Sequence, residues 1–311
     1  MRVIGGEIEL KRFLNKIIYT DSGRSSLKLL LQTRSIKKVL LPDYLCEVII
    51  EILKNENIEF DFYHINEDLS FDIESIKSKE FDALYIINYF GIQHEKIKGM
   101  EEDKIIIEDN VFFFDFENDM NYENWFAFNS YRKITSLADG SLIKTNLKVT
   151  ERNSKISYFS TLKYKAKFLK YDYIYNKKGK EENYLRLFNK AEKIVGKKIA
   201  YISNESIYLL SKLNYDNIMR IRKKRFNKLY STFEPFCLNK KVNEYSFFVL
   251  KVENRDNIRK KLFKHKIFLP VHWPKVTENI LYDKVLSVPL FENYSDEEFE
   301  YMFNILKGYV L

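Results

Sequence analysis

Residues 104–145 read KIIIEDNVFFFDFENDMNYENWFAFNSYRKITSLADGSLIKT. This stretch holds three short runs rich in β-branched or aromatic residues, at 105–108, 125–129 and 141–144, and each has the length of one strand. Similar runs come earlier in the chain, with helix-period segments of about 10 residues between them. This alternation is typical of a mostly parallel sheet covered by helices, so the sequence predicts an α/β fold. The other predicted strands are 38–41, 58–63 and 83–88, and two of the predicted helices are 24–32 and 44–54.

The composition narrows the class of protein. The chain has 311 residues, of which 45% are hydrophobic, so it can bury a sizeable core. Its two cysteines, Cys46 and Cys237, cannot make a disulfide framework, and its four histidines show no metal-ligand spacing. No run of about 18 apolar residues occurs, and the amino terminus does not resemble a signal peptide. We therefore expect a cytoplasmic protein with no metal site and no stable membrane insertion.

The second half of the chain contains a basic segment and then a mixed α/β region. Between residues 155 and 198 there are thirteen Lys/Arg and four Asp/Glu, a net charge of +9, whereas the whole chain has +8. This segment is either a solvated helical hairpin or a positively charged surface that binds a phosphate-bearing ligand. From about residue 205 onward, helical segments flank a predicted strand at 245–252. We expect a large domain over 1–200 and a small α/β domain over 201–311.

Three polar constellations stand out, one at the start of a predicted helix and two after predicted strands. The segment 20–27, TDSGRSSL, is a glycine turn that opens a helix; such a start either binds phosphate through its N–H groups or is simply capped. Asp109 ends an apolar strand, where it either binds a ligand or only begins a loop. Lys133 follows another strand. A desolvated lysine there could form a Schiff base with an aldehyde cofactor, although most lysines are ordinary surface residues.

The order and spacing of these constellations resemble the pyridoxal-phosphate (PLP) enzymes of fold type I, and within them the DegT/StrS-like sugar aminotransferases. Ser130, three residues before Lys133, is similar to the serine of a divergent Ser-x-Arg-Lys subgroup. The resemblance covers most of the chain and implies a large domain with a mixed, mostly parallel seven-stranded sheet and a small C-terminal α/β domain. The segments that carry it are 22–27 (SGRSSL), 41–46 (LPDYLC), 88–91 (NYFG), 105–110 (IIIEDN), 220–230 (RIRKKRFNKLY), 270–274 (PVHWP) and 286–290 (LSVPL).

The resemblance also implies roles for individual residues. Lys133 would hold PLP covalently and later move a proton between the substrate Cα and the cofactor. Asp109 would pair with the protonated pyridine nitrogen and so keep the ring an electron sink. Ser130, with the backbone of Arg24 and Ser25, would bind the cofactor phosphate. The cofactor-binding residues implied in this way are Gly23, Arg24, Ser25, Tyr44, Cys46, Asp109, Ser130 and Lys133, with Tyr44 or Cys46 over the ring face.

The implied reaction is transamination in a homodimer, with glutamate as amino donor and a keto-sugar nucleotide of surface-polysaccharide synthesis as acceptor. Because a nucleotide diphosphate is an anion, we predict that lysines of the basic segment bind it. These lysines form two sets, Lys163, Lys165 and Lys167 (the proximal lysines) and Lys177, Lys178 and Lys180 (the distal lysines).

The sequence departs from the family pattern in ways that keep alternatives open. Phe112 stands where the family commonly has Gln or His in contact with the phenolic oxygen of the cofactor. The chain is also shorter than most members, by some 60 residues on the resemblance. The alternatives are a different PLP reaction on the same scaffold and a catalytically silent relative. A third alternative, a basic nucleic-acid or membrane-binding module, is suggested by the aromatic residues interleaved with lysines at 158–175.

Overall fold

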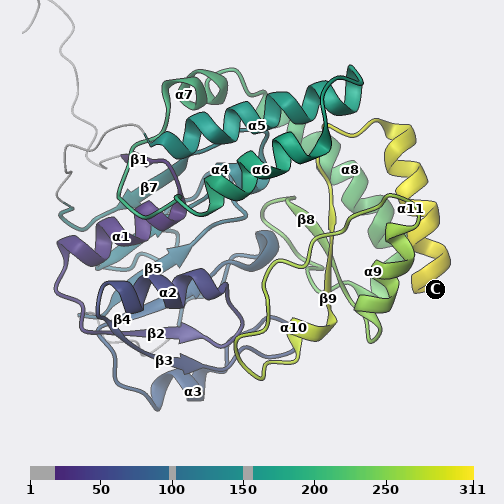
Figure 1. Cartoon of the computed structure of the whole chain (residues 1–311). Helices are drawn as coiled ribbons and strands as arrows, with labels where there is room; N and C mark the ends of the chain where they lie inside the picture. The colour runs from purple at the N-terminus through teal and green to yellow at the C-terminus, as the bar shows by residue number, and fades with distance from the viewer. Residues whose placement is uncertain (1–17, 98–102, 150–156) are drawn as a thin grey trace, which may run out of the picture.

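The main sheet has seven strands in the order β1-β7-β6-β5-β4-β2-β3 (Figure 1). The structure, a computed structural model, describes residues 18–97, 103–149 and 157–311. Neighbouring strands from β3 to β6 are parallel, and β7 is antiparallel to both β6 and β1, so the expected mixed, mostly parallel sheet is confirmed. The strands are β1 (Ile18–Thr20), β2 (Lys38–Pro42), β3 (Glu59–Tyr63), β4 (Ala83–Ile87), β5 (Ile105–Asp109), β6 (Trp125–Phe128) and β7 (Ser141–Thr145).

Helices cover this sheet and form most of the C-terminal part (Figure 1). None of the helices in the described ranges combines the length and the hydrophobicity that a membrane crossing requires. The helices are α1 (Gly23–Thr33), α2 (Glu47–Asn55), α3 (Ile73–Lys77), η1 (Tyr89–Gly91), α4 (Tyr131–Ile134), α5 (Tyr158–Tyr175), α6 (Glu181–Glu192), α7 (Asn204–Leu210), α8 (Tyr215–Phe233), η2 (Glu234–Phe236), α9 (Arg255–Phe263), α10 (Leu281–Lys284) and α11 (Asp296–Val310).

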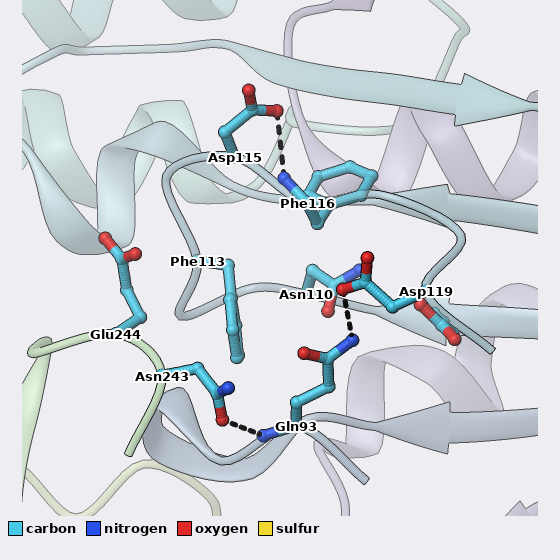
Figure 2. Close-up of a pocket in the computed structure, with 9 residues that line it drawn as sticks. Gln93, Asn110, Phe113, Asp115, Phe116, Asp119, Asn243 and Glu244 are labelled. Atoms are coloured by element: carbon cyan, nitrogen blue, oxygen red, sulfur yellow. Dashed lines mark hydrogen bonds between the residues drawn. The ribbon is translucent and has the colours of Figure 1, made fainter. Parts of the chain in front are cut away.

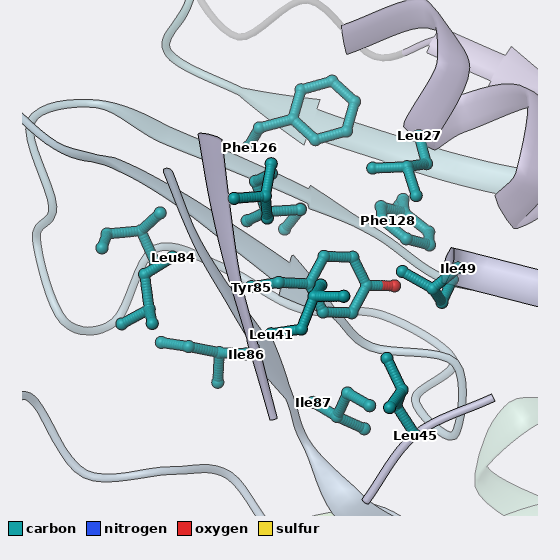
Figure 3. Close-up of a cluster of buried hydrophobic side chains, with 14 of the residues drawn as sticks. Leu27, Leu41, Leu45, Ile49, Leu84, Tyr85, Ile86, Ile87, Phe126 and Phe128 are labelled. Atoms are coloured by element: carbon teal, nitrogen blue, oxygen red, sulfur yellow. The ribbon is translucent and has the colours of Figure 1, made fainter. Parts of the chain in front are cut away.

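The core forms because the central strands are apolar on both faces. All five residues of β4 are buried, which is the pattern of a parallel strand covered on both sides. Figure 3 shows Leu41 of β2 and Phe126 of β6 beside this strand, with Leu27 of α1 and Ile49 of α2 among them. Each fully buried side chain of this size contributes about 1.5–3 kcal/mol of hydrophobic free energy. The core therefore fixes the sheet whose carboxyl edge carries the candidate site.

Two sequence predictions need correction. The helix predicted from residue 44 begins at Glu47, because Tyr282 Oη accepts the Leu45 amide and donates to the Leu45 carbonyl, both at 2.9 Å. These bonds hold the backbone outside the helix. The strand β1 was not predicted, since three residues are too few for a period-2 pattern to be visible.

The C-terminal part contains a second, two-stranded antiparallel sheet of β8 (Phe247–Lys251) and β9 (Val285–Pro289). Its own hydrophobic cluster includes Leu229 of α8, Leu262 of α9 and Leu306 of α11. The predicted strand at 245–252 is confirmed, whereas β9 was not predicted as a strand. The boundary between domains near residue 200 stays a prediction.

The basic segment is a helical hairpin of α5 and α6, as one of the two interpretations expected. Lys155, which belongs to the predicted segment, lies outside the described residues. Asp139 anchors the hairpin to the turn after α4, because the Ser160 hydroxyl of α5 donates to its Oδ2 at 2.6 Å. The amide and hydroxyl of Ser203 donate to Asp139 at 2.8 Å each, and the Ser206 hydroxyl also donates to it. Asp139 thus joins α5 and α7 to the turn that follows α4, the helix that carries Lys133.

Candidate active site

Asp109 is the last residue of β5, at the carboxyl edge of the parallel strands. Its carboxylate is buried and accepts a hydrogen bond from Tyr85 Oη at 2.7 Å and one from the Val111 amide at 3.0 Å. Burial raises the pKa of Asp109 to about 6, although both bonds and the nearby Lys133 ammonium favour the ionised form. The carboxylate is therefore oriented and ionised at neutral pH, ready to pair with a protonated nitrogen.

Lys133 lies on α4, the single-turn helix that follows β6. Its amide donates to the carbonyl of Ser130, a buried residue at the N-cap, at 2.9 Å. The side chain of Lys133 is accessible to solvent, yet the surrounding protein still desolvates its ammonium. This desolvation, and then the Arg132 guanidinium, lowers the pKa of Lys133 to about 8. A large share of the amine is therefore neutral and nucleophilic in mildly basic solution.

Cys46 lies close to this pair, whereas Tyr44 packs away from it. The Lys133 ammonium lowers and the Asp109 carboxylate raises the pKa of the Cys46 thiol, but desolvation is the largest effect and raises the pKa overall. The ring of Tyr44 packs edge-on against Trp273 and Tyr282, with centroid separations of 4.8 and 5.0 Å. Of the two residues predicted over the ring face, Cys46 is therefore the one that neighbours Lys133 and Asp109.

The start of α1 reaches the end of β6 because residue 23 is glycine. A Cβ on Gly23 would lie 3.0 Å from the Phe128 ring and 3.4 Å from the Asn129 carbonyl oxygen. The Ser22 hydroxyl caps the helix by accepting the Ser25 amide at 3.3 Å, and the Ser25 hydroxyl donates to Asp21 at 2.6 Å. Because the cap uses the Ser25 amide, the first-turn amides that this helix start offers a ligand are those of residues 23 and 24.

The predicted lysines do not form one cluster. Lys163 and Lys167 of α5 lie close together, since desolvation and then Lys163 lower the pKa of Lys167 to about 8. Lys165 is exposed. The distal lysines occupy the α5–α6 loop and its end, which points away from α1 in Figure 1. A helix rises 1.5 Å per residue, so this loop lies about 20 Å from Lys163. The proximal lysines therefore lie nearer the candidate site.

Phe112 is buried among aromatic rings and touches His272, at 5.2 Å between centroids. The Nε2 atom of His272 is buried and has no hydrogen-bond partner in the part of the chain that the structure describes. Desolvation, and then the Lys133 ammonium, lowers the pKa of His272 to about 3. A neutral imidazole with an unpaired nitrogen thus lies near Lys133. The Nε2 atom of His272 therefore offers a polar atom near the position where the family commonly has Gln or His and this chain has Phe112.

A polar cavity of about 140 Å³ is lined by Asn110, Phe113 and other residues that follow β5 (Figure 2). Adjacent strand residues point to opposite faces, so Glu108 faces this cavity whereas Asp109 faces Tyr85. Burial raises the pKa of Glu108 and of Glu244 to about 7 each. The cavity therefore suits hydrogen-bond donors or cations and does not suit a phosphate. Its lining residues are Gln93, Glu108, Asn110, Phe113, Asp115, Phe116, Asp119, Asn243 and Glu244.

Four residues near the candidate site were not singled out from the sequence. Tyr85 lies in an apolar strand, and nothing in the pattern distinguishes its hydroxyl. Arg132 and His272 stood inside quoted motifs, but no role was given to either. Glu192 is one of the few acids of the basic segment, which is a signal that could have identified it.

No protein-family model matches the sequence, and no curated protein matches it. Solved structures do match. The sugar aminotransferase CalS13 from Micromonospora echinospora superposes with a TM-score of 0.62 at 12% identity, over 94% of this chain and 87% of that chain. A DegT DnrJ EryC1 StrS aminotransferase from Brucella abortus gives 0.61 at 15% identity, over 94% and 86%. The chain has the fold of these aminotransferases.

The PLP-form of Spr1654 from Streptococcus pneumoniae matches in the same way, with a TM-score of 0.65 and 13% identity over 94% of this chain and 86% of that chain. The expected fold type I is thereby confirmed. At these identities the likeness concerns the fold, so the roles of Asp109 and Lys133 stay predictions. In this chain, Asp109 and Lys133 both lie at the carboxyl edge of the sheet. Open α/β sheets bind their ligands at this edge.

Proposed function

We propose that the chain is a cytoplasmic PLP-dependent aminotransferase that transfers an amino group, from glutamate, to a keto-sugar nucleotide in surface-polysaccharide synthesis. The observation that carries this proposal is the pair of Lys133 and Asp109, a lysine with a pKa of about 8 near a buried, oriented carboxylate. The fold shared with sugar aminotransferases supports the class of reaction.

The residues present fit PLP. The buried and unpaired Nε2 of His272 offers a hydrogen-bonding atom for a polar ring substituent, and the first-turn amides at the start of α1 offer donors to a phosphate. When bound, PLP withdraws electrons from the carbon that carries the amino group. Lys133 would hold the cofactor through its amine and carry a proton at Nζ. Asp109 would keep the pyridine nitrogen protonated.

Ser130 and the first-turn amides of α1 would bind the cofactor phosphate, and Cys46 would lie against the ring. The proximal lysines would attract the diphosphate of the nucleotide sugar, because they lie nearer to Lys133 than the distal lysines do. Charge attraction of this kind raises the local concentration of an anionic substrate without entering the chemistry.

The proposal includes a homodimer. Seven exposed large hydrophobic side chains lie on the α5–α6 hairpin, and exposed hydrophobic surface is a common feature of protein–protein interfaces. Light scattering of the purified protein should give twice the mass of the chain. The side chains are Tyr158, Phe168, Tyr171, Tyr173, Ile174, Tyr175 and Leu185.

The test is covalent trapping of PLP. Borohydride reduction of the PLP-loaded protein, followed by peptide mass spectrometry, should place the cofactor on Lys133. Lys133→Ala should be colourless and inactive, whereas Lys144→Ala, at a buried lysine of β7, should keep the adduct. A reduced adduct that persists in Lys133→Ala would contradict the assignment. A wild-type protein that binds no PLP but binds RNA would favour the nucleic-acid alternative.

A further inference from the structure

The cavity that Glu108 faces is lined by acidic and amide side chains and, among the described residues, by no lysine, arginine or histidine. Glu108 belongs to β5, whereas Glu244 comes from the segment before β8. Both residues are buried, with 2% and 4% of their surface exposed. Figure 2 shows Glu244 on one side and Asp119 on the other, with Phe113 and Asn110 between them. Acidic groups from distant parts of the chain thus line one space.

The two buried carboxyls keep unused acceptor atoms. Tyr215 Oη donates to Glu244 Oε2 at 2.6 Å, whereas Glu244 Oε1 is buried and has no hydrogen-bond partner in the described part of the chain. The Phe114 amide acts to lower the pKa of Glu244 without completing a hydrogen bond to Oε1. His94 Nε2 lies 3.6 Å from Glu108 Oε1, which is too far for a hydrogen bond. Both carboxyls can therefore accept further donors.

Two buried donors beside Glu108 are also unpaired. Trp125 Nε1 and Asn110 Nδ2 act to lower the pKa of Glu108, yet neither atom completes a hydrogen bond with any described residue. The amide of Asn110 is held in its orientation, because Asn88 Nδ2 donates to Asn110 Oδ1 at 2.5 Å. Buried polar atoms normally have partners. A ligand that satisfies this lining must therefore bring an acceptor as well as donors.

Positive charge acts on this lining from outside the cavity. Lys144 Nζ lies 2.7 Å from Asp115 Oδ1. Burial raises the pKa of Glu108 and of Glu244 to about 7 each, although the Arg222 guanidinium acts to lower that of Glu244. A cation inside the cavity would favour the ionised form of both carboxyls.

We propose that this cavity binds a small hydroxylated amine, whose ammonium group pairs with the buried carboxylates and whose hydroxyl group accepts from Asn110. An ammonium group has three N–H donors for carboxylate oxygens, and a hydroxyl both donates and accepts. Phe113 and Phe116 add aromatic surface, which a cation also favours. The acids are spread over the lining, and no group of three or more acidic, histidine or cysteine side chains among the described residues is placed to hold a metal ion. A ligand with several separate polar groups therefore fits better than a single ion.

The cavity is distinct from the candidate active site, since Glu108 and Asp109 point to opposite faces of β5. Amino alcohols and amino sugars both carry the required pair of groups. An amino sugar is also the class of product that the proposed reaction makes, and this link alone rests on the proposed function. An amino sugar bound in this cavity would allow the product to act back on the enzyme.

Titration calorimetry on the full chain tests the proposal with ethanolamine, ethylamine and ethylene glycol as matched probes. Ethanolamine carries both groups and should bind more tightly than either of the others. Glu244→Gln keeps the size of the side chain but removes its charge, so it should weaken ethanolamine binding at least about tenfold. Glu300→Gln is the matched control, because Glu300 pairs with Lys228 outside the cavity and should leave the affinity unchanged.

Binding should also release protons, because the ammonium group favours the ionised carboxylates. With two groups of pKa about 7, the release should approach one proton per ligand at pH 7 and the affinity should rise from pH 6 to pH 8. Two buffers with different heats of ionisation give the proton count. Burial lowers the pKa of His94 to about 4, so His94 stays neutral in this range. The other charged or titratable groups that act on the two carboxyls are Asp115, Asp119, Tyr122, Tyr215 and Arg222.

Glucosamine, titrated beside glucose, distinguishes the two sources. Binding of glucosamine but not of glucose identifies an amino sugar, whereas binding of ethanolamine without glucosamine identifies an amino alcohol, and either result supports the site. The proposal would be overturned by equal ethanolamine affinity in the wild type and Glu244→Gln, by ethylene glycol binding as tightly as ethanolamine, or by a wild type that binds neither amine at millimolar concentrations.

Asp119→Asn replaces Glu244→Gln if the latter shows no cooperative thermal transition. Asp119 is exposed, so this variant should fold and should weaken ethanolamine binding about two- to fivefold at low salt. Unchanged affinity in Asp119→Asn would then contradict the proposal. None of these measurements needs PLP, so a failed aminotransferase assay and a failed binding assay are distinguishable.

Discussion

Tyr85→Phe tests the electrostatics of the candidate site with almost no change in packing. The substitution removes the hydroxyl that donates to Asp109 Oδ2 at 2.7 Å and keeps the buried ring. This bond favours the ionised carboxylate, so its loss should raise the pKa of Asp109 above the present value of about 6. A hydrogen bond to a charged group contributes about 1.5–3 kcal/mol, and one pKa unit equals about 1.36 kcal/mol. We therefore expect a pKa between about 7 and 8 in the variant.

The raised pKa of Asp109 also makes the free energy of unfolding depend on pH. The folded pKa of Asp109, about 6, lies above its ordinary value of 3.8, so the stability linked to this group is present below pH 3.8 and is lost as the pH rises through 6. In Tyr85→Phe, where the pKa of Asp109 should be higher, the free energy of unfolding should continue to fall up to a higher pH. At pH 8 the extra destabilisation should be about 1–3 kcal/mol larger than at pH 4.

The direct assay is a pH titration of the Asp109 side chain by carboxyl ¹³C NMR, in the wild type and in Tyr85→Phe. Tyr63→Phe is the matched control, because the hydroxyl of Tyr63 donates to the Tyr85 carbonyl at 3.0 Å and not to Asp109. An Asp109 pKa that stays the same or falls in Tyr85→Phe would refute this account of how the carboxylate is held.

Three further predictions concern other parts of the molecule. Asp109→Asn should still bind PLP but lose several orders of magnitude in the half-reaction with the amino donor, measured as the spectral change on adding glutamate; near-wild-type conversion would assign the role to another residue. Neutralising the proximal lysines should raise KM for the sugar nucleotide at low salt and less at high salt, whereas the distal lysines should matter less; unchanged kinetics in both sets would make the segment a charged surface. Gly91→Ala should cost about 2–4 kcal/mol in urea unfolding, because residue 91 has φ +87° and a Cβ would lie 1.9 Å from the Glu244 carbonyl oxygen. Gly179→Ala, at φ +80° with nothing within 4 Å, should cost only about 1 kcal/mol, and equal losses would show that the contact is unimportant.

The fold was predictable because its central strands are short, continuous apolar runs with polar residues at their ends. The positions of Asp109 and Lys133 at the carboxyl edge of the sheet were predictable for a related reason, since each follows such a run, whereas their roles stay predictions. The contacts of Glu192 were not predictable. It lies 60 residues from Arg132 and 168 from Arg24, and their meeting depends on how the α5–α6 hairpin packs over α1. The unpaired nitrogen of His272 likewise depends on rings that come from separate parts of the chain.

The four hydrogen bonds that Asp139 accepts have a consequence for redesign of this scaffold. Asp139 lies six residues after Lys133, so the hairpin is bound to the turn directly after α4, the helix that carries the amine. A hairpin exchanged to accept another substrate must therefore keep a serine equivalent to Ser160, whereas Ser203 and Ser206 belong to α7 and its N-cap and stay in place. A replacement hairpin without this serine would remove one of the four donors to a buried carboxylate, at a cost of about 1–3 kcal/mol. The distal end of the hairpin has no such tie to Asp139, and new recognition elements can be introduced there first.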